Sequence, residues 1–439
     1  MEKFRENIAV GHQRALLVGA VFRNTYYDNL AELVALAESA GAIIVDRIQQ
    51  KVNTIHPATY IGSGKAEYVR QRAKSSKANV IIFDNDLSPG QIRELEEIIG
   101  VKVIDRSELI LDIFASRART KQAKLQVELA QLEYTYPRLT RMWGHLDTVA
   151  GAAGGTTAGA VGAIGTRGTG EKQLEIDRRI VNKRIIELKK ELVEIDGRRI
   201  REIDARRGLF KVCLVGYTNA GKSTLMNALT DADVYVEDRL FATLDTRTRQ
   251  WILEGSKKVL LSDTVGFVKN LPHQLVASFK ATLEEAVNAD LLLHIVDVSS
   301  PEAHEQAENA KKVLDEIGCK DKNTIVLLNK ADIVAKRSQL ELLETIYPDS
   351  ICISAKTKMN LDLLREKVIE IYIGQRVVFR ITINAADGKT QNHLESATNV
   401  INRHYGDDTV IMDVSVGRNQ LAELQRLNPL KIEEIDIYE

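Results

Sequence analysis

A stretch near the middle of the chain has the residue types and the spacing that are needed to hold phosphate. Residues 210–223 read FKVCLVGYTNAGKS, in which a hydrophobic run leads into Gly216 and, after four further residues, into Gly221, Lys222 and Ser223. The helical pattern TLMNALT follows directly. A strand, a glycine loop and a helix in this order are the context that a phosphate-binding P-loop requires.

The chemistry of phosphate binding explains each residue type in this loop. Glycines let the backbone bend so that successive N–H groups face the phosphate oxygens. Lys222 is placed to neutralise the β- and γ-phosphates, and the Ser223 hydroxyl is placed to ligate Mg²⁺. The remaining loop residues expected to contact the phosphates are Tyr217, Thr218, Asn219, Ala220 and Thr224.

Two later motifs predict which base is bound. The apolar run 325–328 is followed by Asn329, Lys330, Ala331 and Asp332. The Asp332 carboxylate can accept hydrogen bonds from the N1–H and the exocyclic amine of guanine, a donor pair that adenine lacks. Further along come Ser354, Ala355 and Lys356, and the backbone N–H of Ala355 is expected to face the guanine O6.

Between the P-loop and these base motifs lies DTVG, which consists of Asp263, Thr264, Val265 and Gly266. We expect Asp263 to hold Mg²⁺ through water and the Gly266 N–H to reach the γ-phosphate. These motifs, in this order and each after a strand, predict a protein that binds GTP or GDP with Mg²⁺ and hydrolyses GTP.

The threonine that should close on Mg²⁺ when the γ-phosphate is present is not fixed by spacing. Thr243, Thr246 and Thr248 all lie in FATLDTRTR and each is possible. Ras-like enzymes usually carry a water-positioning Gln directly after DxxG, but Phe267 occupies that position here. Intrinsic hydrolysis should therefore be slow until a partner or a reordered loop positions the water.

The elements that must position these residues form an α/β pattern over 208–375, the predicted GTPase domain. Strands are expected at 211–215, 259–263, 291–297 and 324–329, with helices between them. The amino-terminal segment 1–105 shows a similar alternation, with apolar runs expected to form a buried parallel sheet. These runs span 15–21, 42–45, 80–83 and 101–104, with helices at 30–39 and 91–99.

The second amino-terminal helix has clear start and stop signals. Ser88 can cap it, Pro89 suits its first turn, Gln91 completes a capping box and Gly100 can end it. At the other end of the chain, residues 376–439 predict a small α+β domain. Its expected elements are a strand at 377–383, a helix near 393–405, a strand at 410–416 and a helix before Leu427.

Residues 106–207 predict a long antiparallel helical hairpin. Apolar residues at alternating spacings of four and three give one seam at Leu125, Leu129, Leu132 and Tyr136, and a second at Val181, Ile185, Leu188, Leu192 and Ile195. The connector 144–170 holds 9 of the 27 glycines, and Asp147 and Arg167 are its only charged residues. It is therefore not an ordinary short turn between helices.

Charge is distributed unevenly along the chain. The whole sequence has 60 Lys and Arg against 61 Asp and Glu, whereas 106–207 contains 20 basic and 14 acidic residues. Such a concentration is typical of a surface that meets a polyanion, although a solvated helix face with interleaved signs explains the charge alone equally well.

Composition limits the class of protein. A chain of 439 residues with 44% hydrophobic and 28% charged residues is long enough for about three folded domains. Its 3 cysteines are widely spaced and odd in number, which argues against a disulfide framework or a cysteine-based zinc site. The start of the chain carries no targeting pattern and no run approaches a membrane span, so we expect a cytoplasmic protein.

Taken together, the motifs resemble the HflX family of ribosome-associated GTPases, in the Obg-HflX branch of translation-factor GTPases. The resemblance rests on GYTNAGKSTL, FATLDTRTR, DTVGF, NKAD and SAK in order, preceded by a glycine loop that ends in GTRGTGEKQLEIDRR. It covers nearly the whole chain. The loop GAAGGTTAGAVGAIGTRGTG is richer in Ala and Thr than the denser glycine form of the family.

The resemblance completes the predicted site. In this family FATLD carries the switch threonine, which selects Thr243 as the Mg²⁺ ligand beside Ser223 and Asp263. Lys222, Thr243 and Gly266 are then the expected catalytic residues. The resemblance places the rest of the FATLD segment at the nucleotide as well, namely Phe241, Ala242, Leu244 and Asp245.

The resemblance also implies partners and a role. A family member would bind the large ribosomal subunit and its rRNA, with the hairpin and glycine loop reaching toward the peptidyl-transferase centre. GTP-dependent binding would split stalled or hibernating ribosomes, the ribosome would stimulate hydrolysis, and some members would also use ATP. We expect the free protein to be monomeric.

Two other functions stay open at this point. One is a GTP-dependent scaffold for RNA modification or ribosome assembly, in which hydrolysis only times release. The other is an ATP-using RNA remodeller that works from the amino-terminal domain, where IGSGK at 61–65 could cradle a second nucleotide. That motif lacks the P-loop spacing and a following Ser or Thr, so a turn before a helix is the better interpretation.

Overall fold

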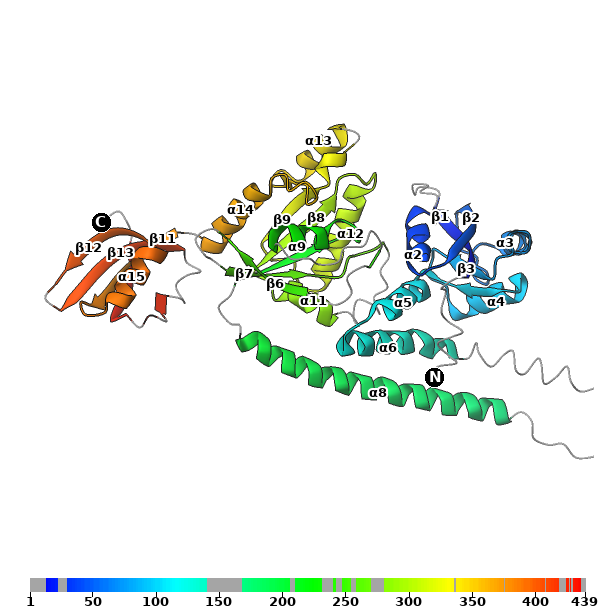
Figure 1. The fold of residues 1–439 in the computed structure, drawn as a ribbon. Coiled ribbons are helices and arrows are strands. Elements are labelled where there is room, and N and C mark those ends of the chain that lie inside the picture. The colour runs from blue at the N-terminus through cyan, green and yellow to red at the C-terminus, as the bar shows by residue number, and fades with distance from the viewer. Residues whose placement is uncertain are drawn as a thin grey trace, which may run out of the picture.

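The computed structural model describes most of the chain as three sheets and a helical middle region (Figure 1). In Figure 1 the amino-terminal part lies at the right, the largest sheet in the centre and the carboxy-terminal sheet at the left, with helix α8 (Gly168–Ala205) running below. The residues described are 13–22, 30–139, 168–205, 210–230, 240–241, 247–253, 258–269, 280–334, 337–374, 376–406, 408–417, 424–425, 427 and 429–435.

The amino-terminal part is a parallel sheet with helices on both faces. Its strand order is β2-β1-β3-β4, with β1 at Arg14–Phe22, β2 at Ile43–Val52, β3 at Val80–Phe83 and β4 at Lys102–Ile104. Alternate residues of β1 enter opposite cores. One core includes helices α2 (Ala31–Ser39) and α5 (Arg106–Arg117), and the other includes α3 (Ser63–Ser76) and α4 (Pro89–Ile99). The predicted buried parallel sheet is confirmed.

Two of these helices begin near residues that the sequence indicated as helix starts. At α4 the Ser88 hydroxyl accepts from the Gln91 N–H, the Gln91 side chain accepts in return from the Ser88 N–H, and Gly100 ends the helix with φ 82°. The predicted capping box is therefore confirmed. In IGSGK, Ile61 and Gly62 precede α3 and residues 63–65 form its first turn, with Gly62 at φ 81° as the N-cap.

The central part is a six-stranded sheet in the order β10-β9-β8-β5-β7-β6. Its strands are β5 (Phe210–Gly216), β6 (Arg247–Ile252), β7 (Lys258–Asp263), β8 (Leu291–Asp297), β9 (Thr324–Asn329) and β10 (Ile351–Cys352). All pairings are parallel except that of the edge strand β6 with β7. The four predicted strands are confirmed, whereas β6 and β10 were not expected.

Helices cover both faces of this central sheet. Leu225 of α9 and Leu364 of α14 belong to the core on one face, and Leu283 of α11 and Leu314 of α12 to the core on the other. The helices of this part are α9 (Lys222–Thr230), α11 (Lys280–Val287), α12 (Ala303–Glu316), the short η3 (Ala331–Ile333), α13 (Arg337–Ile346) and α14 (Leu361–Ile373).

The carboxy-terminal part is an antiparallel sheet with the order β12-β13-β11-β14 and one helix, α15 (Gly388–Ala397). Its strands are β11 (Arg376–Asn384), β12 (Asn399–Tyr405), β13 (Thr409–Gly417) and β14 (Lys431–Ile435). The predicted helix over 393–405 is wrong in its second half, because residues 399–405 pair with β13 instead. Most of the helix expected before Leu427 lies outside the described residues.

The middle region contains α5, α6 (Lys121–Thr135), the short η1 (Tyr136–Arg138) and α8. The two predicted seams pack against each other in one cluster, whose most buried member is Leu188. The first helix of the hairpin is α6 alone, because the helix is interrupted between α5 and α6. There the Thr120 hydroxyl accepts from the Ala123 N–H and caps the start of α6. Helix α5 packs on the amino-terminal sheet instead of on α8.

Ion pairs on either side of the seam show the direction of the two helices. Arg184 pairs with Glu128 at 3.0 Å, and Lys189 pairs with Glu133 at 2.8 Å. Glu128 and Arg184 each directly precede a seam residue, and Glu133 and Lys189 each directly follow one, so the partners in each pair hold the same heptad position. Pairing of like positions occurs when two helices run antiparallel. The hairpin is therefore antiparallel, as predicted, and Figure 1 shows α8 lying alongside α6 and extending beyond it.

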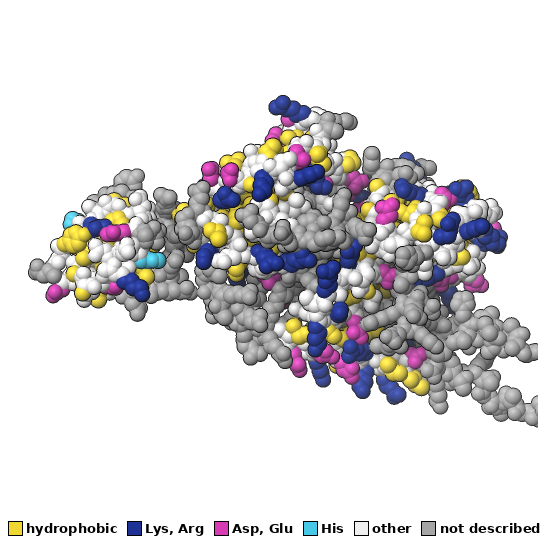
Figure 2. All heavy atoms as spheres, in the orientation of Figure 1, with side chains coloured by type: hydrophobic (Ala, Val, Ile, Leu, Met, Phe, Trp, Pro, Cys, Tyr) yellow, Lys and Arg dark blue, Asp and Glu magenta, His cyan; other side chains and the backbone are white. Residues whose placement is uncertain are grey.

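The outer side of α8 carries charges of both signs (Figure 2). Among its described exposed residues, basic side chains outnumber acidic ones by five to three. The basic residues are Arg178, Arg179, Lys183, Lys189 and Lys190, and the acidic ones are Glu175, Glu187 and Glu194. None of the described helices has the length and apolar composition that a membrane crossing would need.

The hairpin seam generates a stability prediction. Leu188 has no exposed surface, whereas Val193 on the same helix is 70% exposed. Replacing Leu188 with Ala should lower the free energy of unfolding by about 2–5 kcal/mol, since the substitution leaves a cavity in the seam. The Val193→Ala control should change it by less than about 0.5 kcal/mol. Urea denaturation followed by circular dichroism measures both, and equal losses would contradict the seam.

Candidate nucleotide-binding site

The central sheet brings the predicted nucleotide motifs to one edge. Strands β5, β7 and β9 are parallel to one another, so their carboxyl ends lie on the same side of the sheet. The loops that follow these three strands are the P-loop, DTVG and NKAD. Ligands of open α/β sheets bind at this edge.

Two glycines of the P-loop occupy positions that no other residue fits. Gly216 has φ 146° and Gly221 has φ 96°, both in the region that favours glycine. A Cβ on Gly216 would lie 2.3 Å from the backbone oxygen of Ile295, and one on Gly221 would lie 2.3 Å from the side-chain nitrogen of Asn329. The loop thus packs directly on its neighbours through bare backbone.

Lys222 lies inside this loop. Its ammonium group is buried and donates to the backbone oxygens of Gly216 at 3.1 Å and Tyr217 at 2.7 Å. Burial lowers the pKa of Lys222 to about 8, although the charge of Asp263 acts in the opposite direction. A cation held among loop carbonyls at the start of α9 is ready to exchange these oxygens for phosphate oxygens.

Ser223 and Asp263 meet where a Mg²⁺ ion would be expected. The Ser223 hydroxyl donates to Oδ2 of Asp263 at 2.7 Å, and Asp263 is fully buried. A hydroxyl and a carboxylate are oxygen donors of the kind that Mg²⁺ takes in nucleotide sites, so the residues present fit the ion. Next to Asp263, the Thr264 hydroxyl donates to the Leu214 backbone oxygen at 2.7 Å and fixes the strand end.

The residues after Asp263 are paired with the P-loop by backbone hydrogen bonds. The Phe267 N–H donates to the Gly216 oxygen at 3.1 Å, and the Thr218 N–H donates to the Phe267 oxygen at 2.7 Å. Gly266 fits tightly, since a Cβ there would lie 2.7 Å from Cα of Thr218 and 2.8 Å from Nζ of Lys222. The backbone of Gly266 therefore lies against the lysine that should meet the γ-phosphate.

The side chain of Phe267 points into the protein core. It is 2% exposed and packs with Tyr217, Val215 and Leu283. It therefore has neither the hydrogen-bonding group nor the position needed to orient a water molecule.

The base-reading motifs are joined by the buried side chain of Asn329. Its Nδ2 donates to the Ala220 oxygen at 2.7 Å, and its Oδ1 accepts from the Ala355 N–H at 3.0 Å. The N–H of Ala355, expected to face guanine O6, is thus bonded to Asn329 in this structure, because a buried N–H needs a partner within the protein. Asp332, expected to accept from the guanine base, lies exposed on η3.

Other predicted residues complete the description of the site. Lys330 has φ 66°, and its ammonium pairs with Asp297 at 2.7 Å. Ser354 is fully buried, and its hydroxyl accepts from the Thr357 N–H at 3.1 Å, which shapes the loop that contains Ala355 and Lys356.

The FATLD segment is described in part. Phe241 is 2% exposed, and Ala242, Thr243, Leu244, Asp245 and Thr246 lie outside the described residues. Thr248 lies in β6, where its hydroxyl is 2.9 Å from that of Ser262. This contact engages the Thr248 hydroxyl within the sheet.

Comparison with known proteins gives the family. Residues 27–115 match the model described as GTP-binding GTPase N-terminal, residues 117–206 match GTP-binding GTPase Middle Region, and residues 211–330 match 50S ribosome-binding GTPase. The GTPase HflX of Caldanaerobacter subterraneus subsp. tengcongensis is 40% identical over 413 residues, which is 94% of this chain and 92% of that protein. The chain belongs to the HflX family of GTPases.

Other HflX relatives agree with this assignment. The GTPase HflX of Escherichia coli K12 is 38% identical over 384 residues, covering 87% of this chain and 88% of that protein. Among solved structures, a GTP-binding protein from Sulfolobus solfataricus in complex with GDP is 25% identical, with a TM-score of 0.43 over 81% of this chain and 97% of that one.

Sequence reasoning missed the amino-terminal residues that reach this HflX nucleotide site. Glu32 of α2 accepts a 2.7 Å hydrogen bond from the Tyr217 hydroxyl, and Phe114 of α5 contacts Phe241. One signal was present in the sequence. Phosphate binding needs no aromatic side chain, yet Tyr217 and Phe241 stand within nucleotide-binding loops, which is typical of residues that pack on a neighbouring part.

The geometry of the P-loop gives one prediction. Replacing Lys222 with Ala removes the cation from the loop, so GTP and GDP affinity should fall by about 10- to 150-fold, as expected when a charge-assisted contact is lost. Isothermal titration with each nucleotide measures this loss. Lys211, which lies on β5 before the loop, provides a control variant, Lys211→Ala, that should bind normally. Normal binding by Lys222→Ala would remove the P-loop assignment.

The position of Asp332 gives a second prediction. Replacing Asp332 with Asn should weaken guanine nucleotides, because the acceptor for the base N–H groups is lost. It should also improve xanthine nucleotides, because the amide offers a donor to the O2 of xanthine. Competition between GDP and XDP measures the preference. If the preference does not change, NKAD does not read the base.

Proposed function

We propose that this HflX family GTPase binds the large ribosomal subunit and its rRNA, and that its GTP-dependent binding splits stalled or hibernating ribosomes. The observation that carries the proposal is the attachment of a long antiparallel hairpin to a complete P-loop site within one chain. The match of 211–330 to the 50S ribosome-binding GTPase family supports the choice of partner.

The nucleotide chemistry follows from the residues at the sheet edge. Lys222 binds the β- and γ-phosphates, and the N–H of Gly266 reaches the γ-phosphate when the DTVG segment moves off the P-loop. Ser223 and Asp263, with Thr243, would hold Mg²⁺, which neutralises charge on the phosphates when bound. Asp332 and the SAK loop hold the guanine base.

We expect the ribosome to stimulate hydrolysis because the residue that directly follows DTVG cannot place the attacking water. Phe267 stands where a glutamine would do this, and its side chain is buried in the core. Hydrolysis should therefore be slow in the free protein and fast when a contact on the large subunit orders the site.

The hairpin provides the contact with RNA. Helix α8 begins at Gly168, thirteen residues before Val181, the first seam residue. This extension carries the end of the glycine loop about 20 Å past the paired part of the hairpin. Exposed basic residues on α8 can neutralise RNA phosphates, so ribosome affinity should fall steeply as salt is raised.

Turnover and ribosome splitting test the proposal together. GTP turnover should rise strongly with large subunits and little with small subunits. Sedimentation should show that the protein with GTP converts joined ribosomes to subunits. A protein that acts only in ribosome assembly would be stimulated without splitting ribosomes, and a fast rate in the absence of ribosomes would contradict the role assigned to Phe267.

A loop variant sharpens this test. Replacing residues 144–167 with a short Gly-Ser linker should preserve intrinsic turnover and much of the salt-dependent binding, and should impair splitting, because the glycine loop allows close backbone approach to crowded RNA. If this variant splits ribosomes as well as the parent protein, the loop is only a connector.

A further inference from the structure

The hydroxyl group of Thr218, in the P-loop, has no hydrogen-bond partner among the described residues. The residue is only 7% exposed, so bulk water has little access to it. Buried polar groups are almost always bonded, because a group that leaves water without gaining a new partner destabilises the fold. A buried hydroxyl without a partner in a nucleotide loop therefore points to a bond with the substrate or with the water that reacts with it.

The side chain of Thr218 borders the expected position of the γ-phosphate. A Cβ on Gly266 would lie 2.7 Å from both Cα and Cγ2 of Thr218, and 2.8 Å from Nζ of Lys222. These three residues therefore surround one point. Lys222 is expected to bind the β- and γ-phosphates, and the Gly266 N–H is expected to reach the γ-phosphate. Thr218 belongs to the P-loop, so it lies beside the phosphates whether or not the DTVG segment moves.

The backbone that carries Thr218 is held on a rigid part of the site. The Thr218 N–H donates to the Phe267 oxygen at 2.7 Å, and the Phe267 N–H donates to the Gly216 oxygen at 3.1 Å. A β-branched side chain also has few rotamers available. The Thr218 hydroxyl can therefore be held at a defined point, which is what the positioning of a reactant requires.

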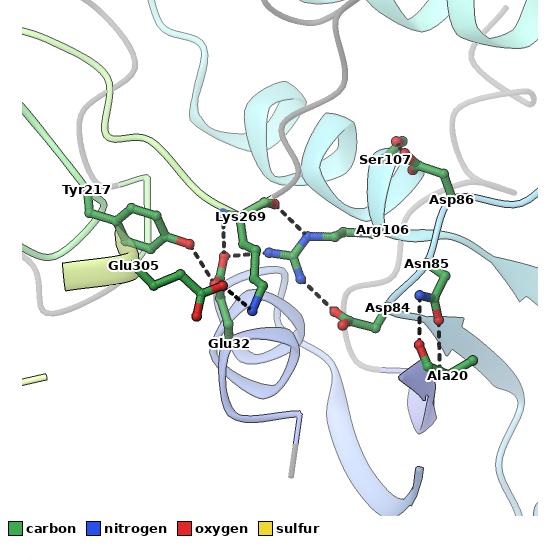
Figure 3. A network of polar contacts seen from close by, with 10 residues as sticks. All are labelled: Ala20, Glu32, Asp84, Asn85, Asp86, Arg106, Ser107, Tyr217, Lys269 and Glu305. Carbon is green, nitrogen blue, oxygen red and sulfur yellow. Dashed lines mark hydrogen bonds and ion pairs between the residues drawn. The ribbon is translucent and has the colours of Figure 1, made fainter. Parts of the chain in front are cut away.

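Other side chains near this position cannot hold a water there. The Tyr217 hydroxyl points toward Glu32 of α2 and donates to it at 2.7 Å (Figure 3). The Thr264 hydroxyl donates to a backbone oxygen of β5 at 2.7 Å. Phe267 has no hydrogen-bonding group, and its ring is buried in the core. Of these neighbouring side chains, that of Thr218 alone combines a hydroxyl with freedom to bond to a water.

We propose that Thr218 is a catalytic residue of GTP hydrolysis, whose hydroxyl oxygen accepts a hydrogen bond from the attacking water and so directs the water at the γ-phosphate. The water oxygen forms a bond to the γ-phosphorus, and the bond from phosphorus to the β,γ-bridging oxygen breaks, with its electron pair leaving on GDP. The proton lost by the water passes to the released phosphate, and Thr218 stays neutral. The slow intrinsic turnover expected of the free protein is then the turnover that Thr218 supports.

The test uses full-length Thr218→Val, which keeps the shape of the side chain and removes its hydroxyl. The single-turnover rate of GTP hydrolysis, measured without ribosomes, should fall about 10- to 100-fold. Affinity for GDP and for a GTP analogue with a β,γ-imido linkage should stay the same, because the lost contact is to the water and not to the nucleotide. Binding of GDP with aluminium fluoride, which mimics the transition state, should weaken.

Two further variants separate catalysis from structure. Thr218→Ser keeps the hydroxyl and should retain most of the parental rate. Thr345 is exposed on α13, and its hydroxyl donates to the Glu341 oxygen within the same helix. The control Thr345→Val should therefore match the parent protein in both rate and affinity.

Three results would each overturn the proposal. The first is an unchanged rate in Thr218→Val. The second is an equal loss of rate in Thr218→Val and Thr218→Ser, which would assign the effect to packing. The third is a loss of GDP and GTP-analogue affinity in Thr218→Val with no loss of rate at saturating GTP, which would make Thr218 a nucleotide-binding residue only. Because intrinsic turnover is measured, the test does not depend on ribosome splitting.

Discussion

The nucleotide site depends on one buried amide, that of Asn329. Its nitrogen binds the backbone of the P-loop and its oxygen binds the backbone of the SAK loop, while Gly221 leaves room for it. A buried amide with both partners satisfied ties loops that are far apart in sequence, and leaving either partner unbonded costs about 1–3 kcal/mol. Asn329 therefore sets the loop expected to read the base and the loop expected to bind phosphate relative to each other.

The contact between the amino-terminal part and the GTPase part follows a different principle. Arg106 is buried and its partners Glu32 and Asp84 are only partly exposed, so desolvation offsets much of the attraction within the cluster. The cluster is therefore a poor source of stability and a good source of specificity, since only one docking geometry satisfies all its groups. The apolar contact of Phe241 with Phe114 adds buried surface but constrains the relative orientation of the two parts less than the hydrogen bonds do.

Much of the fold and the nucleotide site could be predicted because the signals are local. The P-loop strand, the capping box at Ser88 and the seam around Leu188 each depend on residues close together in the chain. The sequence could not show β12, because its pairing with β13 decides its form. Nor could it show that Glu32 reaches Tyr217, 185 residues away, because that contact depends on how two folded parts dock.

The start of helix α5 connects the hairpin to the nucleotide loops. Asp105 caps this helix and is fully buried, and it accepts hydrogen bonds from Tyr134 of α6 and from Arg138 of η1. The next residue is Arg106, which holds Glu32 and the backbone after DTVG. The N-cap residue and the first residue of α5 thus hold the carboxyl-terminal end of α6 and the backbone after DTVG. Because Asp105 and Arg106 are consecutive, a change that displaces Arg106 acts directly beside the residue that holds α6.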